Sequence, residues 1–309
     1  MKSISLTVIV VLTIVGKCTA QGTAMRPTTH QLDAVFSKDV AFSEAIANKT
    51  PKPRRHVPWF VEKFKVSAGV FLTVNNTDVQ IAGNNGNIAT DIDLENDLGF
   101  KTTSTTFLGD FQWRSSSRSR FDLSYYSIHR NSTANLQKTV QFGDHTYNVN
   151  TTVNAYFNTD IYRFSYGYAI LSKPNYEAGL LIGAHVVKAG LGLSITGSNV
   201  SASVQDNFGV TAPLPDFGIW GGYAFGRDWA INGEFDYLAL TVDNIYGRIL
   251  GYNFSVTYRP VKQLNVSLGY TGLNCRVDAT EDHLNGHIKW GYNGPTLTAA
   301  FTFGRKGWD

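Results

Sequence analysis

Apolar and polar residues alternate with a period of two in the second half of the chain, most clearly from residue 229 to residue 270. In the first run, every second residue from Trp229 to Ala239 is apolar or glycine, and the positions between them include Glu234 and Asp236. Two further runs of the same kind follow before residue 270. A period of two indicates β-strands with one apolar and one polar face. Runs of roughly ten residues are long enough for tilted strands to cross a bilayer.

The same alternation recurs from residue 63 onwards. It predicts an all-β protein: a single transmembrane antiparallel up-and-down β-barrel of about 10 strands, with 8 or 12 as alternatives. An even strand number leaves both ends of the barrel in the periplasm, so short periplasmic turns alternate with longer extracellular connections. We expect short turns near residues 115–118, 172–175, 226–228 and 259–262. We expect long connections near 83–99, 131–150, 197–210, 243–247 and 279–285.

The last strand contains one irregularity. Its apolar face ends at Phe301 and Phe303, whereas Trp290 and Tyr292 upstream are apolar on the opposite parity. The parity changes at the Asn-Gly-Pro sequence of residues 293–295, where either a β-bulge shifts the register or the chain turns. A turn would give eleven strands. Because single-chain bacterial barrels have even strand numbers, we expect a bulge.

The beginning of the chain does not follow the alternating pattern. Residues 1–20 combine Lys2, a short apolar stretch and small residues before Gln21, which predicts a secretory signal peptide. Residues 21–62 are expected to form a periplasmic leader with a short helix and a basic, proline-rich linker. The transmembrane barrel is expected to occupy residues 63–309.

Charge and cysteine content narrow the classes of function. The chain has 27 Lys and Arg against 24 Asp and Glu, and the balance becomes 25 to 24 without residues 1–20, which contain Lys2 and Lys17 and no acid. This balance gives no basis for nucleic-acid binding. Cys275 is the only cysteine after residue 20, so no internal disulfide is expected. No motif indicates a cofactor.

Several stretches resemble a family of proteobacterial outer-membrane β-barrel, porin-like proteins. The resemblance covers roughly residues 63–303 and is carried by Thr90–Gly99, Arg120–Tyr126, Thr211–Pro215 and Tyr246–Lys262. It implies a closed barrel in the outer membrane of a Gram-negative bacterium, in contact with outer-membrane lipid and lipopolysaccharide. The terminal strand is similar to the signal that the outer-membrane assembly machinery reads. The resemblance implies no defined activity and carries over no catalytic residue.

Charged residues recur on the faces that a barrel would turn inward. In a narrow ten-stranded barrel they should lie close together, either lining a polar conduit or forming a salt-bridged plug, and we favour the plug. The residues are Lys65, Asp110, Arg114, Asp122, Arg163, Glu177, Glu234, Asp236 and Arg259.

Four carboxylates, Asp91, Asp93, Glu95 and Asp97, recur at every second residue and would share one face of a strand. Hard oxygen ligands held this closely suit Ca²⁺ or Mg²⁺. Since no glycine-centred calcium loop is present, two alternatives remain open: a solvated acidic rim, or carboxylates turned into the lumen against arginines.

Large aromatic residues stand at the predicted periplasmic ends of strands. Trp113, Tyr176, Trp229 and Tyr258 are expected to mark the belt at the membrane interface.

Histidines near the predicted extracellular ends lack a surrounding nucleophile motif, so we expect no enzymatic activity.

The sequence therefore predicts a narrow porin-like channel for ions or small solutes. The alternative is a non-conducting structural or adhesive barrel that binds a partner through its extracellular loops or its leader. Residues 21–62 would be the segment that contacts peptidoglycan or another periplasmic partner.

Overall fold

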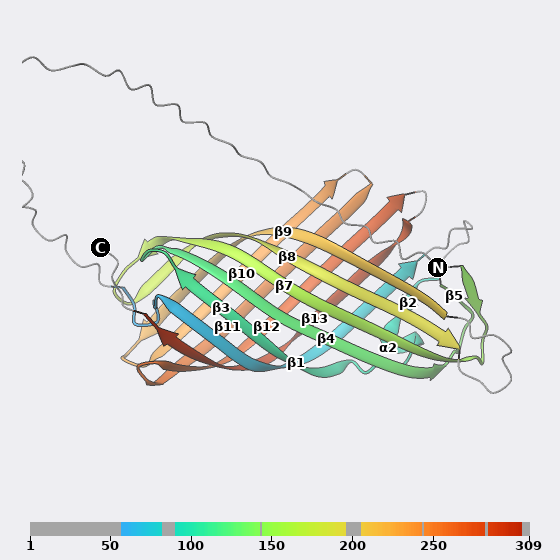
Figure 1. Ribbon diagram of the computed structural model, residues 1–309, viewed down its shortest axis with the longest axis horizontal. Helices are drawn as coiled ribbons and strands as arrows, with labels where there is room; N and C mark the ends of the chain where they lie inside the picture. Colours follow the sequence, from blue (N-terminus) through green and yellow to red (C-terminus); the bar gives the residue numbers. More distant parts are fainter. Residues whose placement is uncertain are drawn as a thin grey trace, which may run out of the picture. The chain divides into compact units, whose positions relative to one another are not determined.

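The computed structural model describes residues 57–304 except 82–89, 143, 196–204, 243 and 282–283 (Figure 1). The signal sequence and nearly all of the leader expected from the sequence lie outside these residues. Among the described residues, no helix is long and apolar enough to cross a membrane.

The described residues form ten long strands in one antiparallel sheet, in which each long strand pairs with the next and β13 pairs with β1. The sheet therefore closes into a ring, and the expected ten-stranded up-and-down barrel is confirmed. The long strands are β1 (Phe64–Ile81), β3 (Thr103–Arg114), β4 (Ser119–Asn135), β7 (Thr152–Ser172), β8 (Tyr176–Ile195), β9 (Gln205–Phe225), β10 (Trp229–Val242), β11 (Ile245–Val261), β12 (Leu264–Glu281) and β13 (Leu284–Phe303).

The remaining elements are short. β2 (Ile92–Asp93) pairs with β1, and one helical turn, α2 (Leu94–Asp97), follows it directly. β5 (Val140–Phe142) and β6 (His145–Tyr147) form a small separate hairpin beyond the end of β4. We call residues 90–100, which contain β2 and α2, the strap.

Three of the predicted long connections are shorter than expected. β9 begins at Gln205 rather than near residue 212, because Pro213 and Pro215 lie within the strand and stay in register with β8. The β10–β11 hairpin is paired as far as Val242 with Ile245, and the β12–β13 hairpin as far as Glu281 with Leu284. Polar residues at these positions belong to strands that continue beyond the membrane.

The outward face of the barrel carries a continuous apolar belt. Its residues are large and exposed, for example Phe107, Leu180, Ile219, Phe254, Leu268 and Phe301. Tyr125 and Tyr162 lie on the same outward face, with their rings 4.8 Å apart. Such a belt requires lipid around it, and a closed barrel leaves no unpaired sheet edge in that lipid. The protein is therefore a transmembrane β-barrel of the outer-membrane type.

Arginine substitutions on this belt should destabilise the barrel more, the closer the substituted residue lies to the middle of the bilayer. Phe254→Arg, at the middle of the belt, is expected to lower the free energy of unfolding by about 2–4 kcal/mol, and Trp229→Arg, at its edge, by about 1 kcal/mol or less. Chemical unfolding in lipid vesicles, followed by tryptophan fluorescence, measures both. Equal losses at the two positions would contradict the placement of the belt.

The barrel wall divides into two parts on the extracellular side. The pairing of β3 with β4 ends at Leu108 and Tyr126, and that of β9 with β10 ends at Phe217 and Tyr237. Beyond these pairs, β4, β7, β8 and β9 form one wall and β10–β13 with β1 and β3 form the other. Figure 1 shows the strands of the two walls running in different directions towards this end.

The space between the two walls is filled with apolar side chains. The ring of Phe157 on β7 lies 6.1 Å from that of Trp290 on β13, and Phe71 on β1 packs edge-on against Tyr292 at 5.4 Å. The strap contributes four buried residues to the same core: Ile92, Leu94, Leu98 and Phe100. The extracellular half is thus packed like a β-sandwich and not like a polar lumen.

This core corrects the interpretation of the last strand. The register between β12 and β13 is continuous through residues 293–295, so the expected β-bulge is wrong. Trp290 and Tyr292 do point to the opposite face from Phe301, because they belong to the interior core. The predicted strand number was right, but the reason given for the change of parity was not.

Candidate functional site

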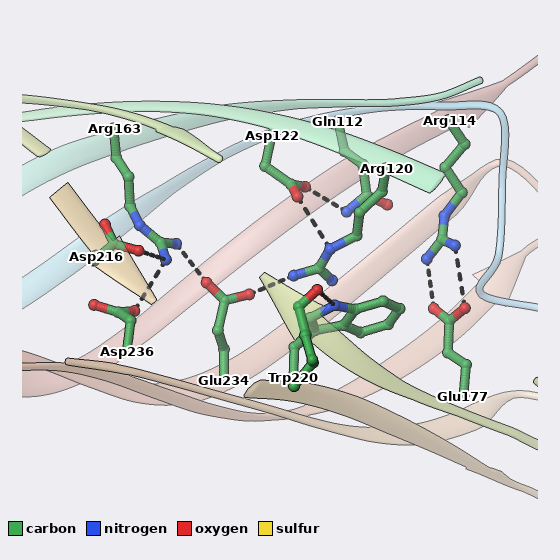
Figure 2. Close-up of polar contacts among 11 residues, drawn as sticks. Gln112, Arg114, Arg120, Asp122, Arg163, Glu177, Asp216, Trp220, Glu234 and Asp236 are labelled. Atoms are coloured by element: carbon green, nitrogen blue, oxygen red, sulfur yellow. Dashed lines mark hydrogen bonds and ion pairs between the residues drawn. The ribbon is translucent and has the colours of Figure 1, made fainter. Parts of the chain in front are cut away.

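Charged side chains occupy the interior on the periplasmic side of the apolar core, and Figure 2 shows the contacts among them. Arg163 on β7 reaches across to β10, where its guanidinium contacts the carboxylates of Glu234 and Asp236, the latter at 3.0 Å. It also lies 3.5 Å from Asp216 on β9. Glu234 in turn accepts a hydrogen bond of 2.5 Å from Arg120 on β4. A chain of alternating charges therefore connects four strands through the lumen.

Arg120 is the second arginine at the centre of this network. It lies 3.1 Å from Asp122 on its own strand, and its guanidinium stacks over the Trp220 ring at 3.9 Å from the centroid. The Trp220 indole N–H donates to the carbonyl of Leu180 at 3.3 Å. Trp220 thus supports one face of the guanidinium while carboxylates take its N–H groups, an arrangement that suits arginine better than lysine.

Two further pairs lie in the same interior. Arg114 and Glu177 form a bidentate ion pair, with one hydrogen bond of 3.1 Å, and each side chain is only 2% exposed. His185 Nδ1 lies 2.8 Å from the fully buried carboxylate of Asp216. Paired and hydrogen-bonded charges of this kind are the condition under which a charged interior is tolerated.

Most of the inward charges predicted from the sequence belong to this network or to the cavity beside it. Arg259 is the exception, since it lies at the periplasmic rim, near Asp228 and stacked on Trp59 at 4.3 Å. Arg120, His185 and Asp216 also belong to the network, but they are not among the inward charges predicted from the sequence. Arg120 could have been found, because it has the same parity as Asp122.

A polar cavity of about 310 Å³ lies beside the network, and Lys65 and Asp110 line it with the charged residues. This volume is enough for roughly ten water molecules. At the periplasmic side Phe60 also lines the cavity, and its ring occupies the space that a side chain at Gly222 would need. At the other side lie Phe71, Tyr126 and Tyr292, of which the two tyrosines are joined through their hydroxyl groups.

The four strap carboxylates do not share one face, because Leu94–Asp97 is helical and not extended. Asp93 caps this helical turn by accepting from the N–H of Asn96. Glu95 forms a buried ion pair of 2.5 Å with Arg130 on β4, while Asp97 lies 2.8 Å from Lys138. The calcium or magnesium cluster predicted from their spacing is therefore not assembled, and Glu95 follows the alternative of a carboxylate turned inward against an arginine.

The four aromatic residues named from the sequence lie at the ends of strands joined by short turns. The rings of Trp229 and Tyr258 are 4.7 Å apart on neighbouring strands, and Trp113 stacks on Phe121 at 5.1 Å. Trp113, Trp229 and Tyr258 are exposed on the outward face. Their position is that of an aromatic girdle at the periplasmic interface.

No protein-family model and no curated protein matches the chain. Among solved structures, the outer-membrane protease OmpT from Escherichia coli aligns over 77% of this chain and 97% of its own, with 11% identity and a TM-score of 0.48. Ail of Yersinia pestis aligns over 78% and 99%, with 9% identity and a TM-score of 0.31. The P. putida toluene transporter TodX aligns over 79% and 91%, with 7% identity and a TM-score of 0.31. The assignment as an outer-membrane barrel rests on the closed sheet and the apolar belt, and these similarities add no activity to it.

Proposed function

We propose that the protein is a non-conducting outer-membrane barrel whose extracellular part, with its two walls and strap, serves as a surface for binding a partner. The observation that supports this most directly is the apolar core between the walls. A permeating ion would have to pass the contact of Phe157 with Trp290, whose aromatic rings cannot replace its hydration shell, and such a passage is strongly unfavourable.

The strap strengthens the closure on the extracellular side. Its Glu95 is held by Arg130 of β4, and the Glu95 carboxylate also accepts from the backbone N–H of Thr77 on β1 at 2.9 Å. One buried ion pair thus joins the strap to strands of both walls. Moving the strap out of the barrel would separate this pair and leave a buried charge unpaired, which is costly.

The proposal includes no catalytic activity. The described histidine that lies beside two carboxylates in the interior is His185, next to Asp216 and Asp236. All three are buried, and Arg163 occupies the adjacent space. A group in this setting is well suited to holding strands together and poorly placed to meet a substrate.

A porin-like channel is the second candidate, and the polar cavity is the observation that favours it. The cavity is lined by charges of both signs, including Lys65 and Arg163, as a selectivity lining would be. In this case the apolar core would act as a gate, closed in the structure described here, that opens when the two walls move apart.

Planar-bilayer recordings separate the two candidates. The purified mature protein, shown to be folded by its heat-modifiable migration on gels, is expected to give no conductance steps, and Arg163→Ala is expected to be equally silent. Reproducible steps in the wild-type protein that change in amplitude with Arg163→Ala would overturn the non-conducting proposal and establish a pathway through the lumen.

A further inference from the structure

Three possible metal ligands from three separate segments meet on the outer surface of the extracellular half. His287 lies on β13, Asp78 on β1 and Asp91 in the strap, immediately before β2. His287 Nε2 lies 2.7 Å from Asp78 Oδ1 and 3.4 Å from Asp91 Oδ1. The three donor atoms all lie within 4.8 Å of one another. The spacing of residues 78, 91 and 287 along the chain gives no sign of this group.

Strand pairing explains why these side chains converge. Lys289 pairs with Asp78 and His287 with Gln80 between β13 and β1, while Asp93 pairs with Asp78 between β2 and β1. Outward residues on β1 up to Val74 belong to the apolar belt, so Asp78 lies beyond the membrane. The three ligands are thus held by regular backbone pairing and face water.

Two carboxylates of this group lie close together. One oxygen of Asp78 and one of Asp91 lie within 4.8 Å of each other. Two ionised carboxylates at this distance repel each other, and a cation held between them removes that repulsion. His287 Nε2 adds a nitrogen donor 2.7 Å from Asp78 Oδ1, so the group offers two oxygen ligands and one nitrogen ligand.

We propose that Asp78, Asp91 and His287 form a binding site for a divalent transition-metal ion, of which Zn²⁺ fits the ligand set best. One imidazole nitrogen with two carboxylate oxygens is a ligand set that zinc accepts, whereas Ca²⁺ and Mg²⁺ prefer oxygen alone. All three side chains are partly exposed, so water can complete a tetrahedral coordination.

Lys289 is the group that a bound metal must displace. Its Nζ lies 3.4 Å from Asp78 Oδ1, and its side chain is 41% exposed. A flexible, half-exposed lysine can turn into water at little cost, but its charge opposes a metal ion. Removing this charge should therefore strengthen metal binding, whereas a plain surface ion-pair cluster would only be weakened by the same change.

A metal at this site would fasten the strap to the barrel wall. Asp91 is the ligand that the strap supplies, and Asp78 and His287 belong to the strands that close the barrel. Because an ion bound only in this arrangement stabilises it by mass action, zinc should reduce opening of the strap. This consequence does not depend on whether the barrel conducts.

Calorimetric titration of the folded, untagged protein with ZnCl₂ tests the proposal. We expect one Zn²⁺ per chain, an affinity at least about tenfold lower in His287→Ala and in Asp91→Asn, and a higher affinity in Lys289→Met. Exposed His129 lies on β4 in the other wall, so His129→Ala is the matched control and should bind like the wild type. Amide hydrogen exchange of residues 90–93 should slow when zinc is added.

The opposite results are equally clear. Absence of zinc binding, or binding that neither His287→Ala nor Asp91→Asn weakens, would overturn the site. Calcium binding as tight as zinc binding would overturn the assignment to a transition metal. If either variant fails to show heat-modifiable migration, Asp78→Asn replaces it, and hydrogen exchange in the wild-type protein provides the decisive measurement.

Discussion

Replacing Glu234 with glutamine is expected to lower the free energy of unfolding by about 3 kcal/mol. The substitution removes the negative charge that lies between Arg120 and Arg163, while both guanidinium groups remain inside the barrel. Breaking one member of a buried charge cluster typically costs about 3–5 kcal/mol, and Asp122 and Asp236 remain to compensate in part. Urea unfolding in lipid vesicles, followed by tryptophan fluorescence, gives the value.

A surface ion pair provides the control for this measurement. Lys138 lies 2.8 Å from Asp97 and is 48% exposed, so Lys138→Gln should change the stability by no more than about 1 kcal/mol. If Glu234→Gln had an effect as small as Lys138→Gln, the interior charges would be solvated as in an open conduit. That outcome would count against the closed barrel.

Trp290→Ala is expected to lower the free energy of unfolding by about 3–5 kcal/mol. Trp290 is 2% exposed and packs against Phe157 of the opposite wall and Tyr292 of its own strand. Its removal would leave a cavity in the core that closes the extracellular half. The same unfolding assay applies, with lipid-facing Phe254→Ala as the control, because that side chain is 58% exposed and leaves no internal cavity.

Conductance measurements on the same variant would extend the result. If Trp290→Ala were stable to within about 1 kcal/mol of the wild type, the two walls would not be held together by this core. If instead the variant lost stability and conducted while the wild type stayed silent, the core would be identified as the barrier to ion flow.

The lipid-facing half of the fold could be predicted from the sequence because lipid imposes one simple requirement. Outward residues such as Phe107, Phe254 and Leu268 must be apolar at every second position, and this periodicity identified the strands and their number. The interior of the extracellular half follows another rule. Its residues are apolar too, so Trp290 and Tyr292 were interpreted as a shift of register and not as a second apolar face.

The candidate sites could be predicted only in part, for a related reason. Parity indicates that Arg163 and Glu234 both point inward, but they are 71 residues apart and meet across the lumen, which no local pattern specifies. The prediction for the strap was wrong in its secondary structure as well as in its contacts. Spacing alone suggested a strand from Asp91 to Asp97, whereas Asp93 caps a helical turn and sends the neighbouring carboxylates to different partners.

Pro213 and Pro215 have a consequence for how molecules of this protein behave beside one another. Above Phe217, β9 is paired only with β8, so its other edge faces away from the ladder. A free edge can template the addition of a strand from a neighbouring molecule, but proline has no N–H to donate at either position. The opening between the walls is thereby protected against edge-to-edge aggregation in a crowded membrane.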